Sequence, residues 1–129
     1  RLIGTRFIAE RSRIAARKHW LRHAPVEPGA AIAIDAAAVS ALVDKGASLL
    51  PIGAVGARGE FRRGDLVAIV RADDADATPL ARGVTQYSAA DIRRIARRRS
   101  HEIETVLGYN YGDTIVHRDD LSLLVDSPR

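Results

Sequence analysis

The segment Gly46-Ala47-Ser48-Leu49-Leu50-Pro51-Ile52-Gly53 decides the fold that this sequence predicts. Its first glycine supplies the left-handed conformation that ends a helix, and its proline favours an extended conformation for the residue before it. A second segment, Gly59-Glu60-Phe61-Arg62-Arg63-Gly64-Asp65, is typical of a turn and leads into the apolar run 66–70. Together the two segments predict a helix that ends at Gly46 and strands joined through glycine turns.

A strand and a helix precede the first segment. The apolar run 31–34 predicts the strand, and Asp35 follows at the position of a helix N-cap. Apolar residues then recur at spacings of three and four, which places them on one buried helical face: Val39, Leu42 and Val43. Further upstream, the polar and arginine-rich residues 10–23 predict a linker that runs into a short helix.

Short elements also follow the segment. We expect strands at about 50–57, 66–72 and 80–87, with a solvated acidic loop at 73–76. Ser88 is expected to cap one helix, and a second helix starts at about Ser100 and ends at Gly108. Two closing strands, 115–116 and 121–125, flank a bend at 117–120. These elements predict a mainly β fold with short helices, a mixed β-barrel of five to six strands.

The apolar residues define one predicted core. The chain has 129 residues, which is the size of a single domain. We expect the core to contain Leu42, Leu66, Val67, Ile69 and Val84, with Trp20 packed against one end of the barrel as a hydrophobic plug.

Composition narrows the chemistry. The sequence contains no cysteine and no methionine, so disulfides, thiolate metal sites and cysteine nucleophiles are excluded. No apolar run approaches the roughly 20 residues that span a bilayer, and we expect no membrane partner and a cytoplasmic location. The chain begins with Arg1, and we expect it to be a piece of a longer protein.

The net charge of +4 comes almost wholly from arginine, since lysine occurs only at Lys18 and Lys45. Arginine recognises phosphate through its planar donor fork. A composition rich in arginine and alanine is also typical of a GC-rich genome. The run 97–99, with Arg93 and Arg94 one turn earlier, is the densest positive patch and is most typical of a solvated helix end. Charge by itself therefore leaves both interpretations open.

Two constellations have the residue types of a metal or catalytic site. His19 and His23 are four residues apart, which places both imidazoles on one helical face, but no third ligand is near them in sequence. Ser48, His117 and Asp119 are the residue types of a hydrolytic triad, yet no nucleophile-elbow pattern surrounds the serine. The bend 117–120 is more typical of side-chain-to-backbone hydrogen bonds. We therefore predict no catalytic, cofactor-binding or metal-binding residue.

Aromatic residues are few and widely spaced in the sequence. They predict no stacking platform for nucleobases: Trp20, Phe61, Tyr87, Tyr109 and Tyr111.

Four motifs together resemble one protein family. Besides the two glycine segments, they are Ala16-Arg17-Lys18-His19-Trp20-Leu21 and Val116-His117-Arg118-Asp119-Asp120-Leu121. In this order they resemble the C-terminal PUA domain of the bacterial glutamate 5-kinase family, a PUA-like pseudobarrel named after pseudouridine synthases and archaeosine transglycosylases. Gly4-Thr5-Arg6-Phe7 is similar to the end of that family's amino-acid kinase domain. The sequence departs from the family at Ala37 and Arg97, where glycine is usual.

The resemblance implies a domain organisation and a function. It makes residues 1–12 the end of the kinase domain and a linker, 13–126 the PUA domain, and 127–129 a tail. Glutamate 5-kinases phosphorylate the side-chain carboxylate of glutamate with ATP and Mg²⁺ in the first step of proline biosynthesis, and that chemistry belongs to their N-terminal domain. This chain is then a non-catalytic regulatory or assembly module. Its implied partner is the kinase domain, and the resemblance allows a homo-oligomer.

RNA binding is the alternative function. PUA domains elsewhere bind RNA through the helix-to-strand segment, backed by the last strand, and the matching positions here are Gly46, Ala47, Ser48, Leu49 and Gly53. Phosphate recognition would place four arginines on one open face beside that segment: Arg58, Arg62, Arg63 and Arg118. Dispersed arginines would favour the regulatory or assembly module.

Overall fold

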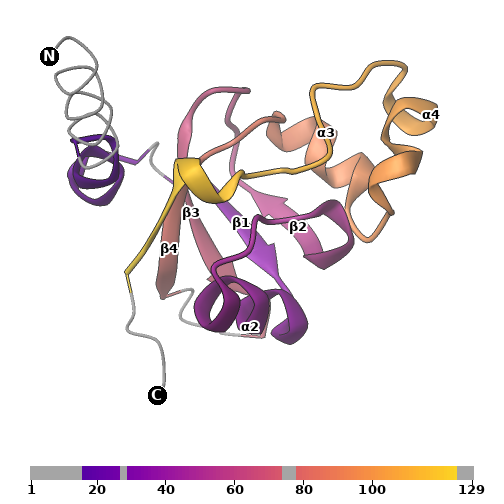
Figure 1. Cartoon of the computed structure of the whole chain (residues 1–129). Coiled ribbons are helices and arrows are strands. Elements are labelled where there is room, and N and C mark those ends of the chain that lie inside the picture. The colour runs from indigo at the N-terminus through magenta and orange to yellow at the C-terminus, as the bar shows by residue number, and fades with distance from the viewer. Residues whose placement is uncertain (1–15, 27–28, 74–77, 125–129) are drawn as a thin grey trace, which may run out of the picture.

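The structure is a computed structural model that describes residues 16–26, 29–73 and 78–124. Its centre is a five-stranded mixed sheet with the strand order β2-β1-β3-β4-β5 (Figure 1). The strands are β1 (Ala31–Ile34), β2 (Ala54–Arg58), β3 (Leu66–Arg71), β4 (Pro79–Val84) and β5 (Leu121–Leu123). The sheet with its short helices confirms the predicted fold class.

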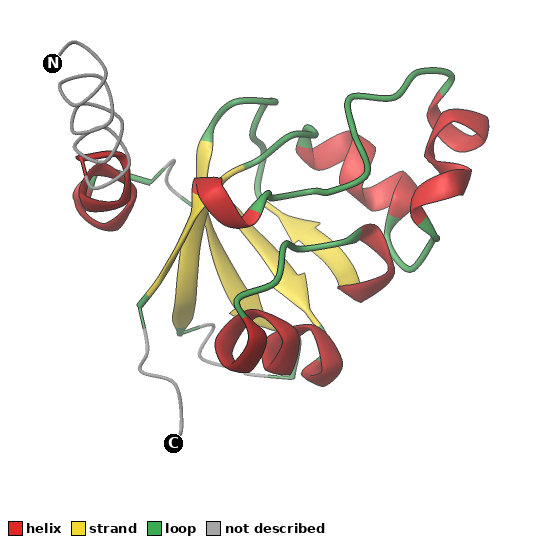
Figure 2. Ribbon diagram, viewed as in Figure 1, coloured by secondary structure: helices red, strands yellow, loops and turns green. Residues whose placement is uncertain are grey.

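Helices lie on one face of the sheet and to one side of it (Figure 2). The α-helices are α2 (Ala36–Lys45), α3 (Ala89–Ile95) and α4 (Ile103–Leu107), and residues 16–23 form a further helix. Three 3₁₀ turns complete the set: η1 (Pro51–Gly53), η2 (Ser100–Glu102) and η3 (Arg118–Asp120). In Figure 1, α2 and the α3–α4 pair lie on one face of the sheet, and the helix 16–23 lies beyond the β4 side.

The strand pairing joins segments that are far apart in the sequence. β1 and β3 are parallel, with Ile32 opposite Ile69, and the other three strand pairs are antiparallel. Parallel strands require a crossover connection, which α2 and β2 provide here. An isolated antiparallel bridge joins Leu49 to Val116. This bridge fixes the helix-to-strand segment against the last part of the described chain.

Helix boundaries lie where the sequence predicts them. The Asp35 carboxylate accepts a hydrogen bond from an N–H of the first turn of α2 at 2.8 Å, and Gly46 ends the helix with φ at 64°. Ser88 Oγ caps α3 in the same way at 3.2 Å, and Gly108 ends α4 with φ at 89°. Each cap satisfies a backbone group that the helix leaves unpaired. Ala37 lies inside α2, where alanine is a favourable residue, so its departure from the family pattern disturbs no turn.

One core fills the space between the sheet and the helices α2, α3 and α4. Leu42, Val67 and Ile69 are 1% exposed or less, and Leu66 is 7% exposed. These four residues confirm the predicted core. Val84 is only partly buried.

The prediction that Trp20 plugs the barrel is wrong. Trp20 is 47% exposed, whereas its neighbour Leu21 is fully buried. Successive residues of a helix point roughly 100° apart, so only one of the two can face the barrel. Leu21 is the buried one of the two, and Trp20 lies beside the guanidinium of Arg17, 5.9 Å from the ring centroid.

Three predicted strands are shorter than the sequence suggests. The predicted strand 50–57 begins with the turn η1, because Pro51 has no N–H and fits the first position of a helical turn. The predicted strand 80–87 ends at Val84, after which the Thr85 hydroxyl bonds the Tyr87 carbonyl at 2.6 Å in a local turn. The predicted strand 115–116 is reduced to the single bridge between Leu49 and Val116.

Some predictions fall outside the described residues. They concern residues 4–7, the first part of the linker helix, most of the acidic loop, and Val125 at the end of the last strand. Within the part that the structure describes, no helix combines the length and the apolar character needed to cross a membrane.

Candidate functional site

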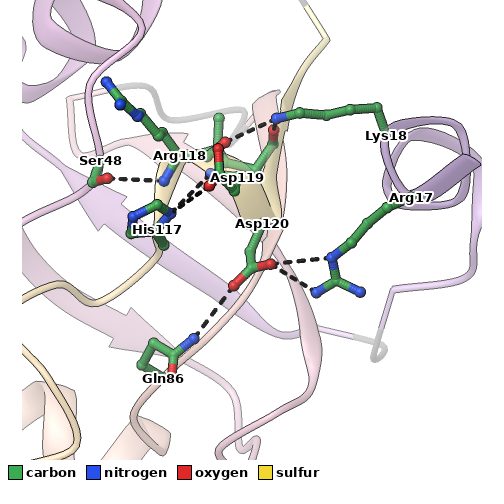
Figure 3. Close-up of polar contacts among 9 residues, drawn as sticks. Arg17, Lys18, Ser48, Gln86, His117, Arg118, Asp119 and Asp120 are labelled. Atoms are coloured by element: carbon green, nitrogen blue, oxygen red, sulfur yellow. Dashed lines mark hydrogen bonds and ion pairs between the residues drawn. The ribbon is translucent and has the colours of Figure 1, made fainter. Parts of the chain in front are cut away.

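The predicted RNA-binding segment and the bend 117–120 lie against each other. The Leu49 N–H donates to the Val116 carbonyl at 2.8 Å, and the Ile115 N–H donates back to the Leu49 carbonyl at 2.8 Å. The Ser48 hydroxyl accepts a hydrogen bond from the Arg118 N–H at 2.8 Å (Figure 3). Two of the four motifs that carry the family resemblance are thus parts of one site.

Side-chain-to-backbone bonds hold the bend, as the sequence predicts. His117 Nδ1 accepts a hydrogen bond from the Asp119 N–H at 3.1 Å and caps η3. A hydrolytic triad needs the opposite arrangement, in which Nδ1–H donates to a carboxylate and Nε2 accepts the serine proton. His117 Nδ1 lies 3.6 Å from the Asp119 carboxylate, beyond hydrogen-bond distance, and the bond that it does accept agrees with the prediction that side-chain-to-backbone bonds hold this bend.

The helix 16–23 is fastened to the same bend by charged side chains. Arg17 donates to Asp120 from Nε at 3.1 Å and from Nη2 at 2.8 Å. Gln86 Nε2 donates to the other carboxylate oxygen at 3.4 Å. Lys18 Nζ donates to the carbonyl oxygens of Arg118 at 2.8 Å and Leu121 at 2.5 Å (Figure 3). The helix thus contributes its own residues to the site.

Arg82 on β4 completes the attachment of this helix. Its guanidinium donates to the carbonyl oxygens of Arg22 and Ala24 at the C-terminal end of the helix. A cation at this position satisfies unpaired carbonyls and complements the helix dipole.

A basic depression forms where the helix 16–23, the end of α2 and the last strand meet. Its volume is about 310 Å³. Three cationic residues, Lys18, Arg22 and Arg118, line it beside Gly46 and Ala47. Its other lining residues are Leu42, Leu121, Ser122 and Leu123. Cationic donors beside the backbone of the predicted segment suit a phosphate or a carboxylate.

Sequence reasoning missed Lys18 and Arg22 as site residues. They are four residues apart on one helix, a spacing that places both side chains on the same face. That spacing was visible in the sequence. The sequence did not show which element this helical face packs against.

The four arginines predicted for an RNA surface do not gather in one place. Arg118 lines the basic depression beside the helix-to-strand segment. Arg58 lines a groove over β1 and β3, and Arg62 lines a depression with acidic residues. Arg63 lies over the ring of Tyr111, 4.0 Å from its centroid. This dispersal favours the regulatory or assembly module over an arginine-based RNA surface.

Two glycines of the segment serve the fold directly. Gly46 holds the left-handed end of α2. Gly53 allows η1 to pack closely on α2, because a Cβ at this position would lie 2.7 Å from the Cβ of Ala38. The glycine pattern of the segment is therefore explained without a ligand.

The aromatic residues are less scattered than the sequence suggests. Tyr111 lies 5.5 Å from Tyr87 and 5.2 Å from Tyr109, measured between ring centroids. Burial raises the pKa of Tyr87, whose hydroxyl donates to the Gly112 carbonyl at 2.6 Å. The hydrogen bond to the Asp91 carboxylate, 2.6 Å long, raises the pKa of Tyr109. The internal bonds of two of these hydroxyls indicate a structural cluster.

Arg97 joins three parts of the structure. Its guanidinium pairs with the Asp35 carboxylate and donates to the Ile52 carbonyl at 3.0 Å, and its N–H donates to the Pro51 carbonyl at 2.9 Å. The hydrogen bond from Arg97 is the main cause that lowers the pKa of Asp35. Arg97 has φ at 69°, the left-handed conformation that glycine adopts without strain. This conformation explains why glycine is usual here in the resembling family.

Arg97→Gly is expected to be more stable than Arg97→Ala by about 1 to 2 kcal/mol, the cost of left-handed backbone for a residue with a Cβ. Both variants lose the same guanidinium bonds, so their difference isolates the backbone contribution. Urea unfolding of the two variants measures it. Equal midpoints would contradict the left-handed assignment.

His19 and His23 lie next to each other in the structure. Their rings lie 4.5 Å apart on the helix 16–23. Among the described residues, no group of three or more His, Cys, Asp or Glu has an arrangement that could hold a metal ion.

Comparison with known proteins agrees with this geometry. The family model described as "PUA domain" matches residues 30–107. A crystal structure of a PUA domain from Aeropyrum pernix K1, a tartrate complex, is 25% identical with a TM-score of 0.52 and covers 77% of this chain and 45% of that one.

Curated relatives match nearly the whole chain. Glutamate 5-kinase from Xanthomonas oryzae pv. oryzae (strain KACC10331 / KXO85) is 69% identical over 124 residues, which is 96% of this chain and 34% of the relative. Glutamate 5-kinase from Xylella fastidiosa (strain M12) is 63% identical over 125 residues, which is 96% of this chain and 32% of the relative. The chain thus spans about a third of the length of these relatives.

Proposed function

Because this chain belongs to the PUA domain family, we propose that it is the C-terminal module of a glutamate 5-kinase and serves regulation or assembly rather than catalysis. The observation that carries the proposal is the 69% identity to a glutamate 5-kinase across 96% of the chain. That similarity extends beyond residues 30–107 and so covers most of the bend and last strand that hold the helix 16–23.

The proposal divides the protein between two parts. Residues 1–12 belong to the end of the kinase domain and its linker, residues 13–126 to the PUA module, and residues 127–129 to a tail. ATP, Mg²⁺ and glutamate are assigned to the larger part, which this chain does not span. The whole protein acts in the cytoplasm, in the first step of proline biosynthesis.

The 129-residue chain is expected to form no glutamyl phosphate, whereas the whole protein forms it with ATP and Mg²⁺. Phosphoryl transfer requires phosphate-binding and metal-holding groups that the proposal places in the kinase part. Trapping of glutamyl phosphate as its hydroxamate measures the activity of both samples.

The informative third sample is the whole protein without residues 13–129. Its oligomeric state and its glutamyl phosphate formation, each compared with those of the whole protein, report whether the module serves assembly or regulation. Product formed by the purified 129-residue chain would contradict the proposal.

RNA binding is the second candidate function, supported by the basic depression. Lys18, Arg22 and Arg118 place three cationic residues beside Gly46 and Ala47, the position that RNA-binding PUA domains use. The dispersal of the other predicted arginines limits this support to a few phosphate contacts. We therefore expect weak binding that falls steeply with salt.

Arg22→Ala with Arg118→Ala is expected to reduce the logarithmic salt slope of RNA binding by about 0.7 to 0.9 for each phosphate contact removed. Arg98→Ala with Arg99→Ala removes the same charge from another exposed region and serves as the matched control. Arg62→Ala with Arg63→Ala tests the surface predicted from sequence. Titration of a structured RNA at several salt concentrations measures the three slopes. Absence of RNA binding at low salt would eliminate this second candidate function, and the regulatory or assembly module would remain as the proposal.

A further inference from the structure

Three exposed apolar side chains lie close together in the sequence, at the end of the helix-to-strand segment and the start of β2. Leu50, Ile52 and Val55 are 43%, 45% and 46% exposed. They are three of the six large apolar side chains recorded as exposed among the described residues, and all three fall within six positions. Leu50 and Ile52 also line an apolar groove against α2, together with Ala37, Ala38, Ala41, Leu49 and Gly53. Apolar side chains concentrated in this way mark an interaction surface more often than scattered ones do.

The polar groups of the groove already have partners. The Asp35 carboxylate accepts from the Ala38 N–H at 2.8 Å and pairs with Arg97. The Ser48 hydroxyl accepts from the Arg118 N–H at 2.8 Å. The basic depression, which has the cations suited to nucleic acid, shares no lining residue with the groove. The patch therefore fits an apolar protein surface rather than RNA.

The patch is held rigidly. Arg97 donates to the carbonyl oxygens of Pro51 and Ile52 at 2.9 Å and 3.0 Å, which fixes the turn η1 that carries Ile52. Gly53 packs this turn directly on α2. A surface that is ordered before it binds loses less entropy on binding.

A patch of three side chains suits a partner on the same polypeptide. Separate proteins that form a stable complex each bury about 800 Å². A domain on the same polypeptide needs less, because the linker supplies an effective concentration of about millimolar. The chain spans 34% of the length of its Xanthomonas relative, so most of such a protein lies outside it. The helix 16–23 shares the basic depression with Gly46 and Ala47, next to the segment that carries the patch.

We propose that the surface formed by Leu50, Ile52 and Val55 docks on the kinase part of the same polypeptide. This inference rests on the proposed function and names the surface through which the module meets its kinase. It also gives the apolar groove a role separate from that of the basic depression, with which the groove shares no lining residue.

Photo-cross-linking in the whole protein tests the proposal. p-Benzoylphenylalanine replaces Ile52 in one sample and Val55 in a second, so that a disturbance of η1 in the first does not decide the result. Tyr111, which is 43% exposed, is replaced in the control sample. Each protein is mixed with an isotopically labelled copy before irradiation, and mass spectrometry identifies the linked peptides and the copy from which each came.

The expected result is a cross-link from positions 52 and 55 to kinase-part peptides of the same isotopic copy, with little product from position 111. Loss of this product when Leu50→Ser is added would show that the apolar contact is required. Cross-links to the labelled copy would overturn the proposal in favour of a contact between subunits. Absence of cross-links from both positions, or equal yield from position 111, would also overturn it. Glutamyl phosphate formation by the same samples tests the proposed function separately.

Discussion

Leu42→Ala is expected to lower the free energy of unfolding of this chain by about 2 to 5 kcal/mol, the usual cost of truncating a buried leucine. Leu42 is the buried residue of α2 and is only 1% exposed. Its side chain joins the core between α2 and the sheet, in the same cluster as Ile32 and Ile69. Truncation leaves a cavity that the surrounding strands cannot fill without moving. Urea unfolding followed by circular dichroism measures the change.

Leu50→Ala is the matched control for this prediction. It removes the same atoms from a side chain that is 43% exposed, so its effect should stay within about 0.5 kcal/mol. A midpoint for Leu42→Ala equal to that for Leu50→Ala would show that the buried face of α2 has been assigned wrongly.

Gly59→Ala is expected to destabilise the chain by about 2 to 4 kcal/mol, because two costs combine at this turn. Gly59 has φ at 72°, which a residue with a Cβ adopts only with strain. The added Cβ would also lie 2.5 Å from the carbonyl oxygen of Gly29, a backbone atom that cannot rotate away. The turn between β2 and β3 would have to move away from Gly29 and Ala30, the residues that directly precede β1.

Gly64→Ala separates the two costs. Gly64 also has a positive φ, 95°, but a Cβ there would meet nothing within 4 Å. The expected loss is about 1 to 2 kcal/mol, from the backbone conformation alone. Thermal unfolding of both variants measures the two losses of stability. If Gly64→Ala were as damaging as Gly59→Ala, the close approach to Gly29 would have no energetic weight.

Local signals in the sequence were sufficient for the helix boundaries. Asp35 and Ser88 cap α2 and α3, and Gly46 and Gly108 end α2 and α4 in the left-handed conformation. Capping depends on residues within one turn of each other, so the information is local. The same holds for the apolar run of β3, whose boundaries differ from the prediction by one residue.

Where the sequence misled, a distant contact decided the outcome. Trp20 is the larger apolar residue, yet it is 47% exposed and Leu21 is the buried one. Tyr87 precedes α3, and Tyr109 and Tyr111 follow α4, yet the fold brings their rings together. Hydrophobicity ranks side chains by their preference for burial, but does not say which one the fold turns inward.

The sequence by itself determined the helix-to-strand segment, the bend 117–120 and the family to which they belong, because these features reside in short runs of residues. Only the tertiary structure decided which cations surround that segment. Lys18 reaches the Arg118 carbonyl across 100 positions, and Arg17 reaches Asp120 across 103. Arg58, Arg62 and Arg63, closer in sequence, line other parts of the described surface. Contacts over such separations depend on the path of the entire sheet, which no local pattern encodes.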